Sequence, residues 1–181
     1  MSVAADQPSS VRSSVVPGPA ASAGAAADRR TLSFGSLDDI LREVESLALA
    51  APSSIGSWTP AQNIDHVRRL VRFSREGGAI RMPLVFRLLG RLMKSKYLTD
   101  RAKPGFKTVD PFLPPEGVSL DDAVAAFREE IRLASRPGAM SQPSPFLGRM
   151  THEQWEQLHC RHAELHLSFV VPSGDATGNT P

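Results

Sequence analysis

The most informative stretch of the chain is THEQWEQLHCRHAELHLSFVV, residues 151–171. Its first four residues are typical of a capping box, in which the Thr151 and Gln154 side chains each accept a backbone N–H at the start of a helix. Because Pro172 cannot continue a helix, we predict that this helix runs from Thr151 to about Val170. Its predicted core stripe is Leu158, Leu165 and Phe169.

Cap residues and apolar spacing indicate four more helical segments. They run from Ser36, from Thr59 to about Glu76, from about Pro83 to Tyr97, and from Ser119 to Pro137. The second of these opens with another capping box, and the first and fourth carry two aspartates where the helix dipole favours negative charge. The stripes expected to be buried are Leu37, Ile40, Leu41, Val44 and Leu47 in the first, and Leu120, Val124, Phe127 and Ile131 in the fourth.

These segments predict an all-α protein. Four of the helices are long and amphipathic, and no strand-like alternation occurs, which is typical of a four-helix bundle. The second and fourth segments could be parallel, because the connection between them is long enough to carry the chain back along the bundle. We interpret residues 83–97 as a short accessory helix on this long crossover, between the second and third bundle helices.

The composition of the 181-residue chain indicates which residues form the folded domain. Residues 1–29 are mainly Ala, Ser, Pro and Gly, with too little apolar surface to offset the entropy lost on ordering. We predict a disordered N-terminal tail there, a domain over residues 30–171, and a second disordered tail over residues 172–181.

Charge and cysteine content point to a cytoplasmic protein that does not bind nucleic acid. The formal net charge is only +2, and no apolar run approaches the length of a membrane span. The single cysteine, Cys160, cannot form an internal disulfide and favours a reducing compartment. The sequence is compatible with either a monomer or a homodimer.

All five histidines lie on two predicted helices, with His66 on the second and the others at positions 152, 159, 162 and 166. Residues four apart share a helix face, so His162 and His166 can grip one ion, and His159 with His162 is an alternative pair. We interpret His152 as a polar boundary residue, and His159 more readily as a structural residue than as a ligand.

A third ligand must come from another helix, and His66 is the only histidine there. If the second and last helices are antiparallel, His66, His162 and His166 lie roughly 6 to 12 Å from the same end of the bundle. Three neutral imidazoles suit a divalent metal such as Zn, Ni, Fe or Cu, and a catalytic site leaves one position open. Gln62 and Trp155 could lie beside such a site, although Trp155 also suits the core.

Residues 56–66 (GSWTPAQNIDH), 145–155 (PFLGRMTHEQW) and 161–169 (RHAELHLSF) resemble DinB-like proteins of domain of unknown function family 1569. The likeness extends over about residues 30–171. It implies a DinB-like four-helix bundle with the parallel pair, and a divalent metal (Zn, Ni or Fe) held by His66, His162 and His166. Asn63 and Asp65 make the start of the second helix more polar than the usual pattern.

The resemblance also implies a class of chemistry. Some DinB-like relatives are metal-dependent transferases that join low-molecular-weight thiols to electrophiles, and others are hydrolases or isomerases. We therefore expect a small-molecule substrate or a thiol cofactor, and a metal-dependent thiol transferase or hydrolase. The alternative is a non-catalytic helical bundle that binds a metal or a partner. Cys160 points away from the predicted ligands and is expected to be a small buried residue.

The segment between Arg81 and Lys107 holds eight basic residues and one acid, Asp100, among many apolar ones. Its basic face could meet phosphates, anionic lipid or an acidic thiol cofactor. We expect instead that the segment packs its apolar side on the bundle and leaves its basic side in water.

Deleting residues 1–28 should leave the melting temperature unchanged, because this stretch has no apolar stripe to add to the core. Thermal unfolding followed by circular dichroism, on the full chain and the shortened chain, tests this. A fall of several degrees would mean that the deleted residues pack on the domain.

Overall fold

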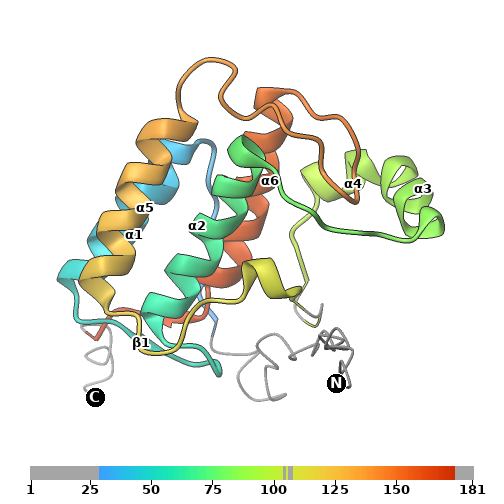
Figure 1. Ribbon diagram of the computed structural model, residues 1–181. Helices are drawn as coiled ribbons and strands as arrows, with labels where there is room; N and C mark the ends of the chain where they lie inside the picture. The colour runs from blue at the N-terminus through green and yellow to red at the C-terminus, as the bar shows by residue number, and fades with distance from the viewer. Residues whose placement is uncertain (1–28, 104, 106–107, 174–181) are drawn as a thin grey trace, which may run out of the picture.

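The computed structural model describes residues 29–103, 105 and 108–173, and it is mostly helical (Figure 1). The helices are α1 (Leu37–Leu49), α2 (Pro60–Glu76), α3 (Leu84–Leu92), α4 (Lys94–Thr99), α5 (Leu120–Ala134) and α6 (His152–Leu167), with a 3₁₀ turn η1 (Asp110–Phe112). Two short strands, β1 (Ser53–Ser54) and β2 (Val170–Val171), pair antiparallel. Among the described residues no helix has the length and apolar character needed to cross a membrane.

The helix starts predicted from cap residues are confirmed. The side chains of Ser36, Thr59, Ser119 and Thr151 each accept the backbone N–H three residues further on, which satisfies an otherwise unpaired donor. Complete capping boxes are present at the starts of α2 and α6. Local side-chain chemistry therefore fixes where the long helices begin.

The long helices α1, α2, α5 and α6 pack against one another around a common core (Figure 1). Helices α2 and α5 lie side by side and run in the same direction, opposite to α1 and α6 (Figure 1). An ion pair joins the last turns of this parallel pair, with Arg75 Nε 2.7 Å from Glu130 Oε1. Fully buried Ile40, Ile64, Phe127 and Ile131 come from three of the four helices.

The end of α6 differs from its prediction. The helix ends at Leu167, and Val170–Val171 form a strand with Ser53–Ser54 instead of a last helical turn. The absence of strands predicted from the sequence is therefore wrong for this short ribbon. Arg30 explains part of the change, since its guanidinium donates to the carbonyls of Leu167 and Val170, which leave the helical ladder.

The predicted disorder of residues 1–28 and 174–181 falls outside the described residues. Three residues that the sequence analysis assigned to the tails, Arg29, Pro172 and Ser173, are among the described residues. Arg29 lies over the Phe169 ring, 5.0 Å from its centroid, and Ser173 donates its N–H to the Ala50 carbonyl at 3.1 Å. Pro172, between β2 and Ser173, is partly buried.

The predicted core stripe of α6 is confirmed only in part. Phe169 is buried and Leu158 is partly buried against the core, whereas Leu165 is partly buried and does not belong to the core. The side of α6 that enters the core instead carries Trp155, Cys160, Ala163 and Leu167. Apolar spacing alone could not separate a core face from a pocket wall, because both are formed mainly by apolar side chains.

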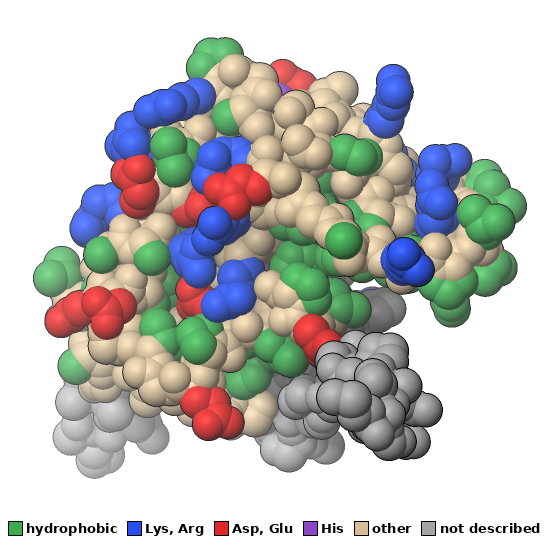
Figure 2. All heavy atoms as spheres, in the orientation of Figure 1, with side chains coloured by type: hydrophobic (Ala, Val, Ile, Leu, Met, Phe, Trp, Pro, Cys, Tyr) green, Lys and Arg blue, Asp and Glu red, His purple; other side chains and the backbone are tan. Residues whose placement is uncertain are grey.

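The accessory segment also differs from its prediction. It forms two helices, α3 and α4, which meet at Met93. Its second half, α4, packs on α6 and buries Leu98, as expected, whereas α3 does not pack its apolar side: the only buried residue of α3 is Gly90, and its apolar side chains project into solvent (Figure 2). Glycine has no side chain, and here it allows α3 to approach the loop at Phe146 closely.

The variant Gly90→Ala should loosen α3, although alanine is favoured over glycine in a helix by about 1 kcal/mol. The new Cβ would lie 2.3 Å from the Phe146 carbonyl oxygen, a backbone atom that cannot simply rotate away. We expect this overlap to dominate and to cost about 1–3 kcal/mol. Amide hydrogen exchange of α3 should become faster. The control is Ser95→Ala at an exposed position of α4, and unchanged protection in Gly90→Ala would contradict the expectation.

Candidate metal centre

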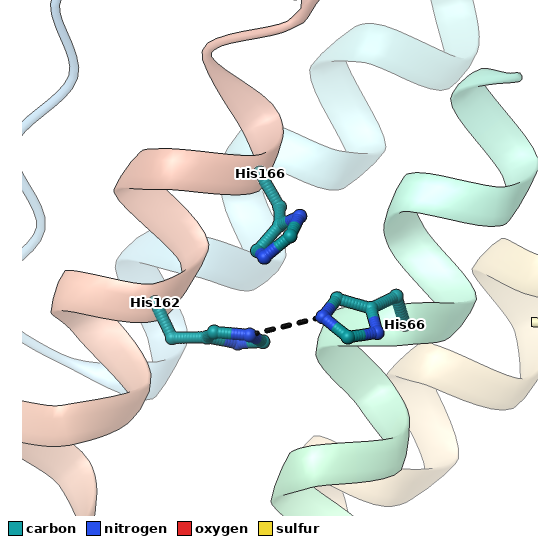
Figure 3. Close-up of side chains that lie close together, drawn as sticks. All are labelled: His66, His162 and His166. Atoms are coloured by element: carbon teal, nitrogen blue, oxygen red, sulfur yellow. Dashed lines mark hydrogen bonds between the residues drawn. The ribbon is translucent and has the colours of Figure 1, made fainter. Parts of the chain in front are cut away.

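Three histidines from two helices meet between α2 and α6. His66 comes from the first half of α2, and His162 and His166 lie one turn apart near the end of α6 (Figure 3). Each ring offers a nitrogen, and these nitrogens all lie within 4.8 Å of one another. The sequence left two pairs on α6 open, and the structure brings together the pair His162 and His166 with His66.

The orientation of the His66 ring is fixed by the backbone. Its Nδ1 lies 2.7 Å from the carbonyl oxygen of Phe112 in η1, and a carbonyl can only accept, so Nδ1 carries the proton. Nε2 of His66 is then a bare acceptor, and it lies 3.1 Å from Nε2 of His162 (Figure 3). Two imidazole nitrogens bound to one tetrahedral zinc lie about 3.3 Å apart, so this separation suits shared ligation.

Burial keeps the three imidazoles neutral. The pKa of His66 falls to about 4, mainly through burial, against which the hydrogen bond to Phe112 acts. Burial, followed by the neighbouring histidines, lowers the pKa of His162 well below its ordinary range, and burial and His66 do the same for His166. Neutral imidazole is the form that binds metal, so all three rings are ready to coordinate at pH 7.

His162 and His166 each have a ring nitrogen that makes no hydrogen bond among the described residues. In each ring Nδ1 is buried without a hydrogen-bond partner among the described residues. Buried polar atoms are normally paired, and each unpaired one destabilises the fold by about 1–3 kcal/mol. A metal bound through Nε2 of His162 would not pair this Nδ1, so the fit to a metal ion rests on the donor set of three neutral imidazoles.

An aromatic side chain that the sequence analysis gave no role covers the centre. The Trp58 ring stacks on His166 at 5.8 Å between centroids and lies 4.8 Å from the His66 ring. The amide of Asn63 holds the Trp58 loop, donating to the carbonyls of Trp58 and Thr59 at 3.3 and 3.1 Å. The sequence did hint at this role, since Trp58 directly precedes Thr59, the cap residue of the helix that carries His66.

The polar residues at the start of α2 position the turn that orients His66. Buried Asp65 pairs with Arg68 and Arg69 at 2.7 and 2.6 Å. Arg69 also reaches the carbonyl of Pro111 at 3.5 Å, next to the Phe112 carbonyl that accepts from His66. Asn63 and Asp65 therefore support the loops around the centre rather than bind a ligand themselves.

The three histidines open on a pocket of about 760 Å³. Its wall is largely apolar and includes Leu158, Leu165 and Phe169 of the stripe that the sequence assigned to the core. Four cationic side chains also line it: Lys96, Arg101, Lys103 and Arg161. A metal held by the histidines would thus face a cavity large enough for a small organic molecule.

The other candidate residues, His159, Trp155 and Gln62, make contacts that stabilise the fold and do not belong to the histidine cluster. His159 is fully buried, its Nε2 lies 3.0 Å from the Ser74 hydroxyl, and it stacks on Trp155. Trp155 is a core residue whose ring N–H donates to the Gln142 carbonyl. Gln62 closes the capping box of α2 and is absent from the pocket wall.

Two further expectations agree with the structure. His152 is partly buried at the start of α6, a boundary position. Cys160 is buried, and burial raises the pKa of its thiol to about 12, so the nucleophilic thiolate is scarce at neutral pH.

The fold and the site together describe a mostly helical protein with three clustered histidines that face a pocket. The family described as "Protein of unknown function (DUF1569)" matches residues 26–173, and the chain belongs to this family. No curated protein and no solved structure matches the chain.

The buried His159 makes a prediction about acid stability. Its pKa is lowered from 6.5 to about 3 by burial, so the unfolded chain takes up a proton that the native protein does not. Its contribution is fully present above about pH 6.5 and is lost as the pH falls towards 3. In His159→Gln this titration is gone. The free energy of unfolding should then depend less steeply on pH, by about 1.4 kcal/mol per unit between about pH 6 and pH 4.

Urea unfolding of chelator-treated protein at several pH values measures the slope. The matched control is Gln157→Ala at an exposed position of the same helix, which removes no titrating group and should leave the slope unchanged. Equal slopes for His159→Gln and the original protein would show that His159 is protonated in the native state.

Proposed function

We propose that the protein binds one divalent metal ion through His66, His162 and His166. The observation that carries the proposal is the approach of three imidazoles from two helices, those of His66 and His166 buried and that of His162 partly buried, with the His66 ring oriented by the Phe112 carbonyl. Such second contacts orient metal-bound histidines in proteins. Three neutral nitrogens suit Zn, Ni or Fe.

We further propose that the metal is used in catalysis on a small molecule. Three protein ligands leave a coordination position, and the histidines border the pocket of about 760 Å³. A metal at this position supplies Lewis-acid chemistry that lowers the pKa of a bound thiol or water. Arg161 is paired with Glu164, and Asp100 also lines the pocket. The apolar wall with Lys96, Arg101 and Lys103 still favours a substrate with an apolar body and an anionic group.

At the level of the fold, we propose a DinB-like four-helix bundle formed by α1, α2, α5 and α6, with α3 and α4 on the crossover. The parallel run of α2 and α5 supports this assignment (Figure 1). A metal-dependent thiol transferase or hydrolase is the corresponding activity. A cytoplasmic location is part of the same proposal, and buried Cys160, free of any disulfide, is compatible with it.

The alternative is a non-catalytic bundle that binds a metal or a partner, and the exposed α3 favours it. A screen of thiol conjugation and ester hydrolysis with metal-loaded protein separates the two functions. Turnover that is lost in His162→Ala supports the enzyme. A bound metal without turnover on any thiol or ester tested would favour the binding module.

The variant His162→Ala should lose the metal and keep its helical circular dichroism. The core is made of apolar side chains from all four long helices and does not depend on the ion, so stability should fall only by the binding free energy that the ion contributed. Metal analysis of protein purified without an affinity tag measures stoichiometry, which should drop from about one to near zero.

The matched control is His152→Ala, a histidine at the other end of α6, which should keep the metal. Retention of metal at full stoichiometry in His162→Ala would exclude the proposed ligand set. Unfolding of that variant at room temperature would instead mark the metal as structural, as in zinc fingers, and would remove the main support for catalysis.

A further inference from the structure

Helix α3 exposes an unusual amount of apolar surface. Its exposed large side chains are Leu84, Val85, Phe86, Leu88, Leu89 and Leu92, with exposed fractions between 46% and 77%. Elsewhere in the described chain only Leu49 and Val109 are large apolar residues of comparable exposure. Single exposed leucines are ordinary, whereas a contiguous cluster of this kind marks an interaction surface.

The geometry of α3 turns this cluster away from the protein. Gly90 faces the Phe146 carbonyl, and at about 100° per residue Leu92 and Val85 lie on the opposite side of the helix. Arg87 and Arg91 fall together on one flank. In Figure 2 the apolar side chains of α3 accordingly form the right-hand edge of the molecule, and basic side chains lie beside them on the side towards the rest of the protein.

The charge around α3 is strongly one-sided. Within the described part of this segment Arg81, Arg87, Arg91, Lys96, Arg101 and Lys103 are all exposed, and the one acid is Asp100. Lys94 is partly buried and donates to the Arg149 carbonyl at 2.6 Å, so it anchors α4 rather than meeting a partner. The surface therefore joins an apolar ridge to a basic rim.

We propose that α3 docks on a membrane surface that contains anionic lipids. The apolar ridge would enter the boundary between headgroups and acyl chains, while the basic rim meets the headgroups, which is how amphipathic helices lie in an interface. Each part of the surface has a role in this arrangement. The proposal does not depend on the metal or on the proposed enzyme activity.

Charge complementarity disfavours two other partners for the α3 surface, a second copy of the chain and a nucleic acid. A second copy joined through α3 would bring two basic rims together, which costs free energy. A nucleic acid would use the basic rim and leave the apolar ridge in water. An anionic bilayer satisfies both.

The position of α3 also connects the docking surface to the pocket. Met93 follows α3 directly, and Met93, Lys96 and Tyr97 line the pocket that holds the three histidines. Docking through α3 would therefore keep the pocket beside the bilayer, which suits a substrate with a large apolar part.

Co-sedimentation of the full chain with vesicles tests the proposal. The protein should bind vesicles of phosphatidylcholine with about 30% phosphatidylglycerol, bind vesicles of phosphatidylcholine alone about tenfold less, and be released by high salt. The double variant Leu88→Gln with Leu92→Gln should lose about tenfold or more in binding to the mixed vesicles. Both leucines are exposed, so the fold should be retained, as circular dichroism can verify.

Two controls match the variants. Leu49→Gln changes a leucine that is 91% exposed on α1, and it should bind as the original chain does. Arg81→Gln with Arg87→Gln should weaken binding, whereas Arg136→Gln at the exposed end of α5 should not. Absence of binding to the mixed vesicles, or binding that Leu88→Gln with Leu92→Gln leaves unchanged, would overturn the proposal. So would a dimer in analytical ultracentrifugation that this double variant dissociates, since α3 would then bind a second copy.

Discussion

The antiparallel contact of α2 with α6 is the constraint on which the site depends. It places a histidine near the start of one helix beside two histidines near the end of the other, and it removes all three from water. An imidazole in such a position loses hydration and gains little from the single carbonyl that pairs with His66. A fold selected for stability alone would fill this space with apolar side chains. The histidines are therefore understood most simply as a site maintained for a ligand.

The surroundings of the site show how polar residues support it indirectly. Asp65 does not face the centre, yet its pairs with Arg68 and Arg69 hold the start of α2 to the turn that contains Phe112. The turn in turn packs on α2 through the rings of Phe73 and Phe112, 5.4 Å apart and nearly perpendicular. One backbone carbonyl is positioned in this way, and that carbonyl selects the tautomer of His66. Asp65 thus acts on the orientation of the His66 ring through the turn rather than by contact with the centre.

The sequence allowed the long helices and the histidine cluster to be predicted because both depend on local rules. Capping boxes fix helix starts within a turn, and the spacing of His162 and His166 places them on one face. The choice between His159 and His166 required tertiary contacts. His159 meets Ser74 on α2 through its Nε2 and stacks on Trp155 in the core, whereas His166 meets His66. Nothing within α6 alone distinguishes these two environments.

The errors share one cause, which is that apolar spacing does not report what an apolar face meets. Leu158 and Leu165 were expected in the core and line the pocket, and the apolar side of α3 was expected on the long helices and lies in solvent. In both cases the protein leaves unburied some apolar surface that could otherwise contribute about 25 cal/mol per Å² to stability. Exposed apolar surface of this kind adds nothing to the stability of the fold. It is therefore normally retained because it binds a ligand or a partner. The two misassigned faces adjoin one another through α4, and this half of the molecule is where ligand binding should be sought.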